Sequence, residues 1–537
     1  MKRLLIISIL LVIAYFFSSC EDFLEPEVHD FISPDLLFEN IDGAKATVAA
    51  VYVRKATSSD RSGLGRDTWH VYEALAPALN ITERRGNRRY CSWRFTAGDG
   101  GINNMWVEKY ISIGRQNSAI DNMRKMDPIE MERPAGYNKL ERLIAEVRFF
   151  RAYTYYRLVG LFGDVPLRIK SVTSPEDPEL YLPRASGSDV YNFIIDELKD
   201  IEGKLPQATE YGPNDVGRIN RGSVQLLLVR TYLQRANTEW AETSDWQSAS
   251  DYAEKIINAG VHGLADHQHD LWYFSNPAKN KNYVANNWEV MWAYQKDERV
   301  HSTPHLIDRA FVPASCNITD RSWWEFQIDY NFYLSFHPDD TRGHHGSLLK
   351  ECENHQGVMV YYDIDRVGET GFSHTTPSVV KWIDPTFLYP TAHANYNLFR
   401  YADVLLLYAE AQNQINNGPN AAAYDAVNQV RRRAFQVNDG SYVLETGLSK
   451  DEFIEALYNE RLWELHSELW GIYDMYRFWD VAKAMVEKSS RTQLPPEFTQ
   501  RQGVPYWEVN LHDYHKRLPV PQAAIDRNPM LNQNPGW

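Results

Sequence analysis

Cysteine is scarce in this chain of 537 residues. There are only four, with no C-x-x-C pair, so the sequence indicates neither a zinc site nor a full set of disulfides. Once Cys20 is set aside for the reason given below, Cys91, Cys316 and Cys352 remain. Three cysteines allow at most one bridge.

Positive charge is also in short supply. The chain has 56 Lys and Arg against 71 Asp and Glu, a net charge of −15, which becomes −17 when Lys2 and Arg3 leave with the N-terminal segment. An acidic balance argues against nucleic acid as a partner and against electrostatic attachment to anionic lipid. Neutral or cationic ligands fit it better.

Motifs of common enzyme classes are missing. The sequence has no nucleophile elbow, no HExxH and no glycine-rich phosphate loop. A glycosidase would need a pair of carboxylates, and Asp99, Glu289, Asp339 and Asp340 are the residues that could supply one. Because no motif supports such a pair, we expect a protein that is not an enzyme.

Histidine offers one possible metal site. His267 and His269 are flanked by Asp266 and Asp270, a spacing that could place several ligands together. A polar loop in solvent explains the same residues more simply. The sequence therefore predicts no metal and no cofactor.

The N-terminus has the features of an exported lipoprotein. A short basic segment precedes the apolar run 4–17, whose 14 residues are few for a membrane span and typical of a signal peptide. Ser-Ser-Cys follows and resembles a bacterial lipobox, so residues 1–19 are predicted to be removed and Cys20 to be lipidated. Glu21 and Asp22 resemble the surface-export signal of Bacteroidota lipoproteins. We expect an outer-membrane anchor facing outward.

Helical periodicity predicts a scaffold of helix hairpins. Apolar and small residues recur at helical spacing, and Gly, Asn or Pro ends each run. Three pairs can be assigned: 140–161 with 188–203, 220–236 with 246–260, and 400–415 with 420–434. Tandem pairs of this kind resemble tetratricopeptide units, which bury their apolar stripes on one another. The predicted fold class is mainly α, a tetratricopeptide-like scaffold with long irregular loops and a few short strands.

The helix expected after Ser449 has charged residues on its inward face. Ser449 and Glu452 form a capping box. Glu460, Glu464 and Glu468 follow at intervals of four, an unfavourable arrangement unless cations lie nearby. The candidate cations are Arg400, Arg461 and Arg477.

Several blocks resemble the SusD/RagB family of outer-membrane nutrient-binding lipoproteins. They are CEDFLE (20–25), AEVRFFRAYTYYRLVGLFGDVPL (145–167), RYADVLLLYAEA (400–411), NERLWELHSELWGIYDMYRF (459–478) and NPMLNQNPGW (528–537). Leu469 and Gly471 depart from the family pattern, which has Gly and Arg there. Arg148 and Arg151, in the second block, are better explained by ion pairs between helices than by a ligand.

This resemblance implies an organisation and a function. Residues 20–270 would form an N-terminal helical part, and residues 271–537 a C-terminal part packed on it as one globular unit. The protein would capture an oligosaccharide at the cell surface and pass it to a TonB-dependent, SusC-like outer-membrane transporter. Some relatives take peptides, so a peptide-binding lipoprotein that uses the concave helix face is the alternative.

The ligand site is predicted in the irregular loops 57–104 and 261–345. The chain has 16 Trp, 32 Tyr and 22 Phe, and because a buried indole N–H needs an acceptor, we expect some tryptophans to face a ligand. Sugar rings stack on aromatic faces. Stacking candidates outside every helical stripe are Trp69, Trp93, Trp272 and Trp324. Polar candidates for sugar hydroxyls are Arg66, Asp67, Asn103 and Asn104.

Overall fold

The computed structural model describes most of the chain between residue 37 and the C-terminus. The described residues are 37–52, 66–81, 87–126, 131–132, 137–212, 215, 217–272, 288–294, 307–313, 316–318, 322, 324–363, 366, 369–371, 376–385, 395–489 and 509–537. The predicted signal peptide and Cys20 lie outside them. Within them, no helix is both long and apolar enough to cross a membrane.

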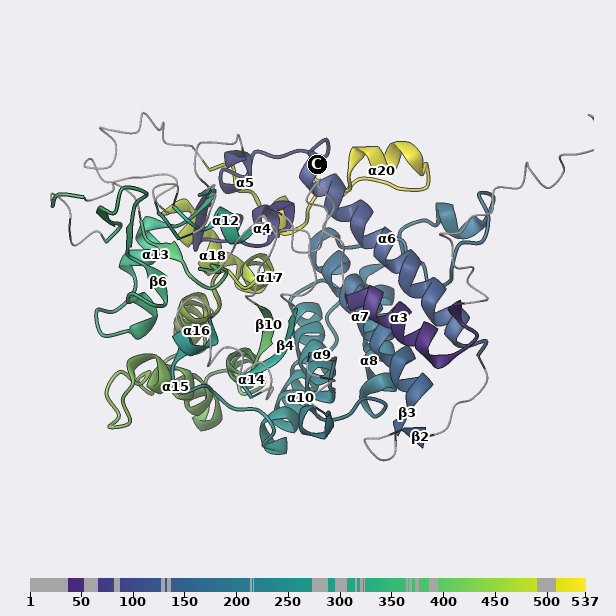
Figure 1. Ribbon diagram of the computed structural model, residues 1–537, viewed down its shortest axis with the longest axis horizontal. Coiled ribbons are helices and arrows are strands. Elements are labelled where there is room, and N and C mark those ends of the chain that lie inside the picture. The colour runs from purple at the N-terminus through teal and green to yellow at the C-terminus, as the bar shows by residue number, and fades with distance from the viewer. Residues whose placement is uncertain are drawn as a thin grey trace, which may run out of the picture.

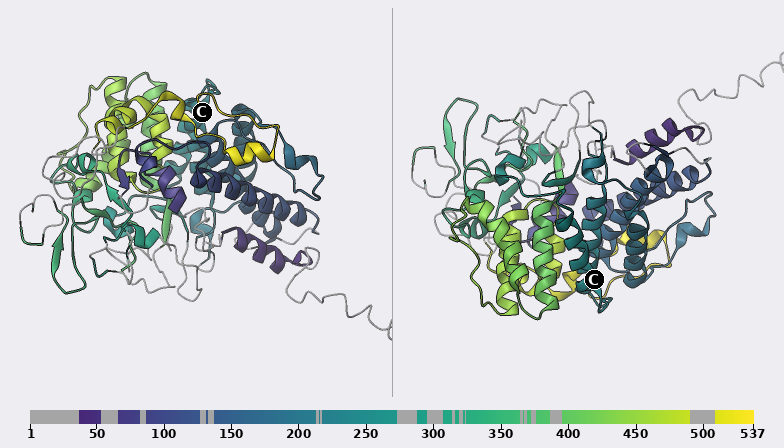
Figure 2. Two further views of the ribbon diagram at one scale, coloured as in Figure 1. Left: turned by 90° about the horizontal axis from the view of Figure 1, so that it is seen from above. Right: turned by 90° about the horizontal axis from the view of Figure 1, so that it is seen from below.

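Seven long helices form one continuous array, in which each packs on the next along the chain (Figure 1). They are α6 (Gly100–Met123), α7 (Lys139–Phe162), α8 (Gly187–Glu202), α9 (Arg221–Ala236), α10 (Asp245–Ala259), α14 (Tyr401–Ile415) and α15 (Ala421–Phe435). Seen from below, α14 and α15 lie beside α9 and α10, although about 140 residues separate them in sequence (Figure 2). The three predicted helix pairs are confirmed, and so is the fold class.

The other described helices complete the scaffold on either side of this array. They are α3 (Ile41–Tyr52), α4 (Arg66–Tyr72), α5 (Arg88–Cys91), α12 (Ile307–Ala310), α13 (Tyr330–Leu334), α16 (Lys450–Leu465), α17 (Gly471–Arg477), α18 (Trp479–Glu487) and α20 (Gln522–Arg527). The predicted capping box is present at the start of α16, where the Ser449 hydroxyl accepts from the Glu452 amide and the Glu452 carboxylate accepts from the Ser449 amide.

Short strands fill the irregular parts of the chain. The described residues contain five two-stranded antiparallel sheets: β1 (Leu79–Ile81) with β5 (Phe326–Ile328), β2 (Met131–Glu132) with β3 (Tyr137–Asn138), β4 (Val290–Tyr294) with β10 (Tyr396–Arg400), β6 (Leu348–Leu349) with β9 (Ser378–Val379), and β7 (Glu351–Glu353) with β8 (Met359–Tyr361). A Cys316–Cys352 disulfide fastens β7 to the body, while Cys91 is a buried free thiol.

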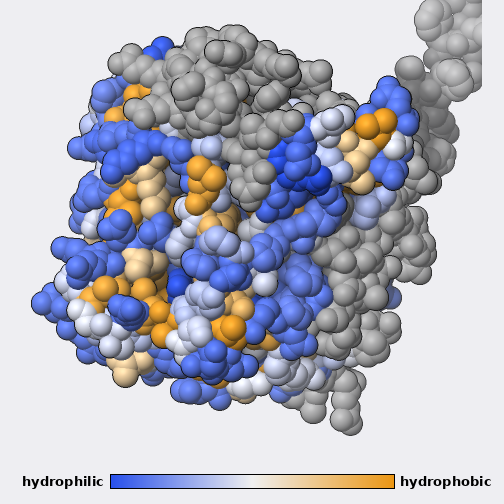
Figure 3. Space-filling view, turned by 90° about the vertical axis from the view of Figure 1, so that its left-hand side faces the viewer, coloured by the Kyte–Doolittle hydropathy of each residue, from blue (hydrophilic) through white to orange (hydrophobic). Residues whose placement is uncertain are grey.

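One hydrophobic core extends from Trp69 to Leu531 and joins both predicted parts of the chain. Core residues on both sides of residue 270 belong to this single cluster. The division of the chain into two parts near residue 270 therefore stays a prediction. On the outer face shown in Figure 3, hydrophobic residues appear in small groups separated by hydrophilic ones.

A network of ion pairs is buried inside this core. The Glu464 carboxylate accepts hydrogen bonds from Arg433 at 2.6 Å, Arg400 at 2.8 Å and Arg342 at 3.3 Å. Arg400, the last residue of β10, also bonds Glu289, directly before β4, at 2.6 Å and Glu468, just after α16, at 2.7 Å. All these side chains are almost fully buried. Burial by itself would raise the pKa of Glu464, but the three arginines outweigh it and hold the pKa below its usual range.

We predict that Arg400→Ala will strongly destabilise the protein. Removal of one partner leaves Glu289, Glu464 and Glu468 buried without their shared cation, which should cost about 3–5 kcal/mol of unfolding free energy. Urea denaturation at neutral pH measures this loss.

Arg432→Ala is the matched control, because Arg432 pairs with Asp425 at the surface and its loss should cost less than about 0.5 kcal/mol. Equal effects of the two substitutions would contradict the structural role of the network.

Candidate ligand-binding site

The two loop regions predicted to form the site meet in the structure. β1, from the first region, pairs with β5, from the second, in the register Leu79 opposite Ile328. Glu325 strengthens the junction, because its Oε1 atom lies 2.9 Å from His70 Nε2 and accepts from Asn87 Nδ2 at 2.9 Å. Residues far apart in sequence therefore share one surface.

Three of the four predicted stacking tryptophans are buried. Trp69 and Trp93 are 0% exposed and Trp272 is 2% exposed, so the expectation that they face solvent is wrong. Each ring packs in the interior: Trp69 against Trp382 at 4.8 Å, Trp93 against His515 at 5.4 Å, and Trp272 beneath Lys381 at 5.0 Å. They anchor loops to the core, where large aromatic side chains bury the most apolar area.

Their indole N–H groups are also unexpected. None of the three N–H groups has an acceptor among the described residues. The assumption that every buried indole has a hydrogen-bond partner therefore fails at these positions, and tryptophan count alone does not indicate exposure.

Trp324 is different because its ring is half-buried. Its backbone has a φ of 45°, a left-handed conformation that is uncommon for a bulky residue, but the buried Trp93 shares it with a φ of 56°, so the exposure of the residue is what distinguishes Trp324. The Trp324 amide donates to the Arg309 carbonyl at 3.3 Å, and its ring lies 6.2 Å from that of Tyr362. Trp324 keeps its role as a stacking candidate.

Two of the four predicted polar residues, Asp67 of α4 and Asn104 of α6, are hydrogen-bonded to each other. Asn104 Nδ2 donates to Asp67 Oδ2 at 3.1 Å, which joins α6 to α4, and the Asp67 side chain is 20% exposed. Asn103 is half-buried, and its Oδ1 atom has no donor among the described residues. Arg66 begins α4, but its side chain lies outside the described residues.

One part of this cluster, the contacts of Arg89 and Tyr90 with Asp99, was not predicted from the sequence. Arg89 Nε and Tyr90 Oη each donate to Asp99 at 2.5 Å, and Asp99 caps α6 by accepting from the Gly101 and Ile102 amides. Burial is the main cause that raises the pKa of Tyr90, so its hydroxyl stays a donor. The sequence held one signal for this part, because Asp99 directly precedes the helix that begins at Gly100, and aspartate is a common helix cap.

Gly101 makes the close packing of this cluster possible. A Cβ atom at Gly101 would lie 2.2 Å from Tyr90 Oη and 3.3 Å from the Asp67 carboxylate. Together, Asp67, Arg89, Asn103 and Asn104 form the polar cluster of the candidate site. Arg89 has a side chain that is 37% exposed, so the cluster offers water-accessible donors and acceptors.

Glu73 fixes α4, which carries Asp67, to the turn before α17. Its carboxylate accepts from the backbone amides of Ser467 at 3.0 Å, Trp470 at 2.9 Å and Gly471 at 3.2 Å. A Cβ atom at Gly471 would lie 2.8 Å from the Ala76 side chain and 3.0 Å from Glu73 Oε2. The departure from the family pattern at Gly471 therefore permits this contact.

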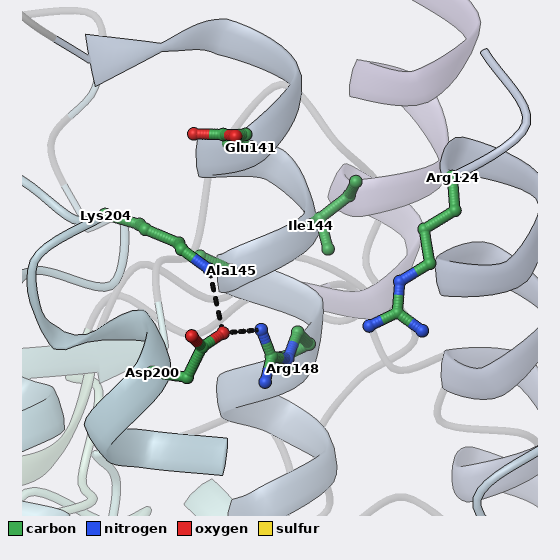
Figure 4. Close-up of a pocket in the computed structure, with 7 residues that line it drawn as sticks. All are labelled: Arg124, Glu141, Ile144, Ala145, Arg148, Asp200 and Lys204. Atoms are coloured by element: carbon green, nitrogen blue, oxygen red, sulfur yellow. Dashed lines mark hydrogen bonds and ion pairs between the residues drawn. The ribbon is translucent and has the colours of Figure 1, made fainter. Parts of the chain in front are cut away.

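A pocket of about 240 Å³ lies elsewhere, between α6, α7 and α8 (Figure 4). Its lining residues are Arg124, Glu141, Ile144, Ala145, Arg148, Asp200 and Lys204. Arg148 and Lys204 both pair with Asp200 and lower its pKa to about 2. Arg148 and Arg151 also bond Glu197 of α8, which confirms that both arginines pair between helices. No aromatic side chain lines this pocket.

Comparison with known proteins identifies the family. A sequence profile described as the SusD family matches residues 253–537, just over half of the chain. The chain belongs to the SusD family. A second profile, described as starch-binding associating with outer membrane, matches residues 67–233, which include the polar cluster.

Individual relatives extend this similarity over nearly the whole chain. SusD-like protein P25 from Formosa agariphila is 25% identical over 558 residues, covering 98% of this chain and 97% of the relative. Starch-binding protein SusD from Bacteroides thetaiotaomicron is 22% identical over 447 residues, covering 73% and 72%. A solved SusD homolog from the same species shares the fold, with a TM-score of 0.76 at 23% identity over 93% of this chain and 97% of its own.

We predict a pH dependence that arises from Glu73. Burial raises the pKa of Glu73 from its ordinary value of 4.5 to about 7, against the opposing effect of the amides that donate to it. The folded protein therefore holds this proton more tightly than the unfolded chain, so stability is fully present below pH 4.5 and falls by roughly 3 kcal/mol as the pH rises to 7.

Glu73→Gln should remove this component of the pH dependence, because a glutamine does not titrate. Denaturant unfolding of both proteins between pH 4.5 and 7 gives the two slopes. If the free energies of unfolding of the two proteins change with pH in parallel, Glu73 does not titrate in this range.

Proposed function

We propose that this SusD family protein binds carbohydrate at the outer membrane and has no catalytic role. The observation that carries the proposal is the polar cluster of Asp67, Arg89, Asn103 and Asn104, which offers partly exposed donors and acceptors. Trp324 comes from the second loop region, and its neighbour Glu325 accepts from Asn87, which in turn accepts from Arg89. Sugar recognition needs this combination of hydroxyl partners and one aromatic face. The names of the starch-binding relative and of the second profile support it.

Three of the four carboxylates that a glycosidase could have used are held in structural contacts, while the fourth, Asp339, is exposed and accepts from the Tyr442 hydroxyl. Glu289 is 0% exposed and bonds Arg400 and Arg433, and Asp340 is 1% exposed and bonds Arg342. Asp99 is 8% exposed and caps α6. These contacts give each of the three a structural role, which supports binding over hydrolysis.

We predict that Asp67→Ala, Asn104→Ala and Trp324→Ala will each weaken carbohydrate binding. Loss of the Trp324 platform should reduce affinity about tenfold, because stacking on an aromatic ring contributes roughly 1–3 kcal/mol. Affinity electrophoresis through gels that contain soluble starch, xyloglucan or laminarin measures retention, and thermal unfolding checks that each variant folds.

Asp425→Ala and Trp463→Ala are the matched controls. The Asp425 side chain is 62% exposed on α15, and Trp463 is a half-buried tryptophan of α16 whose indole donates to Ser335. The polysaccharide gels should retain both control variants as strongly as they retain the unaltered protein. If the three site variants are retained equally well, or if the protein binds a peptide library and no polysaccharide, the proposed site is wrong.

The membrane arrangement is also proposed. A lipid on Cys20 would hold the protein at the outer face of the outer membrane, and a TonB-dependent, SusC-like transporter would receive the bound oligosaccharide. The support is the lipobox-like sequence and membership of the SusD family. A binder held by one lipidated residue must transfer its ligand to a protein that crosses the membrane.

We predict that Cys20→Ala will abolish palmitate labelling and release the protein from outer-membrane fractions, because a stable anchor needs the acyl chains. The unaltered protein, purified in mild detergent, should carry the transporter with it. A Cys20→Ala protein that still labels and sediments with membranes would refute the anchor, and purification of the lipoprotein alone under cross-linking would refute the partnership.

A further inference from the structure

Trp288 is the one tryptophan among the described residues whose side chain is largely exposed. It is 44% exposed, whereas the other described tryptophans are buried or half-buried. It lies just before β4 and beside the segment that follows α10, within the loop region 261–345, but it is not one of the four predicted stacking candidates. An exposed indole at a fixed place in the fold calls for a physical explanation.

The ring of Trp288 is held in one orientation. Its Nε1 donates to the Leu264 carbonyl at 3.3 Å, and its own carbonyl lies 3.1 Å from His262 Nδ1 and accepts from the Gly263 amide at 3.4 Å. The ring packs over Gly263, where a Cβ atom would lie 2.9 Å from Cζ2 and 3.0 Å from Cε2. The indole N–H is thus already hydrogen-bonded, and the part of the ring that faces water is apolar surface.

A chain of buried contacts runs between Trp288 and α4, the helix that carries Asp67. From Trp69 of α4 the contacts run to Trp382, whose neighbour Lys381 bonds Glu468 at 2.6 Å. Glu468 bonds Arg400, and Arg400 bonds Glu289, the residue directly after Trp288. Buried side chains therefore lie between Trp288 and α4.

The surroundings of Trp288 suit a sugar better than a protein. Among the residues that the structure describes, the other exposed large hydrophobic side chains belong to other segments: Ile111, Ile169, Tyr181, Leu334, Val358, Ile415 and Met530. A stable protein interface needs roughly 800 Å² of surface on each partner, with several large side chains at its centre. One rigid aromatic face is enough for a sugar ring.

We propose that Trp288 is a second carbohydrate platform, which stacks on a sugar ring of the same polysaccharide that the polar cluster binds. This inference rests on the proposed function. Two separated contacts on one chain bind a long polymer more tightly than either contact alone, because the second contact forms at high effective concentration. A short oligosaccharide gains nothing from the second contact.

The test combines polymer retention with a direct signal from the ring. In gels that contain soluble starch, xyloglucan or laminarin, Trp288→Ala should reduce retention about fivefold or more, the effect of losing one stacking contact. Tyr181→Ala removes an aromatic side chain that is 50% exposed elsewhere and should leave retention unchanged. In protein labelled with 5-fluorotryptophan, the fluorine resonance of Trp288 is the one that disappears in the Trp288→Phe variant. This resonance should shift when the polysaccharide that the gel test identified is added. It should also shift in the Asp67→Ala variant, because the Trp288 contact does not need Asp67.

The outcomes separate the two proposals. If the unaltered protein is retained, but Trp288→Ala is retained equally and the resonance does not move, the second platform is wrong and the proposed function stands. If the resonance responds only to solubilised outer-membrane proteins, Trp288 is a protein contact and the inference is overturned. If no polysaccharide retains the unaltered protein, the proposed function and the inference fail together.

Discussion

The structure depends on the neutralisation of charges that are buried in its core. Glu464 meets Arg342, Arg400 and Arg433, which come from three separate segments, and Arg400 also bonds Glu468. A buried carboxylate is costly unless its cations are in place, so the ion pairs fix how the C-terminal helices and the β4–β10 sheet assemble. The same network leads through Lys381 and the Trp382–Trp69 contact to α4, and so sets where the polar cluster lies.

Much of the scaffold could be predicted from the sequence, because its signals are local. Helical spacing, stop residues and the Ser449 capping box each act within a few residues, and the structure confirms the helix pairs that they predicted. The predicted cations of α16 show the limit. Arg400 does pair with Glu464 and Glu468, but Arg461 bonds Asp403 and Asp474, and Arg477 bonds Glu410 and Asp474. Partners from distant segments leave no local pattern.

The candidate site could be predicted only in part, for the same reason. The sequence indicated the loop regions and the residues Asp67 and Asn104, which the structure brings to within 3.1 Å. It misplaced Trp69, Trp93 and Trp272 on the surface, because absence from a helical stripe does not reveal burial by tertiary contacts. It passed over Trp288, which is 44% exposed and whose ring packs on Gly263. Whether a tryptophan is an anchor or a platform is decided by packing between segments.

Hydrogen exchange in the presence of a polysaccharide that the protein retains would test carbohydrate capture at the polar cluster most directly. The account predicts slower amide exchange in peptides that cover α4, residues 87–104 and the segment around Trp324, with α9, α10 and α14 unchanged apart from the turn beside Trp288. Protection confined to the helices of the array, or an exchange pattern that the polysaccharide leaves unaltered, would contradict it.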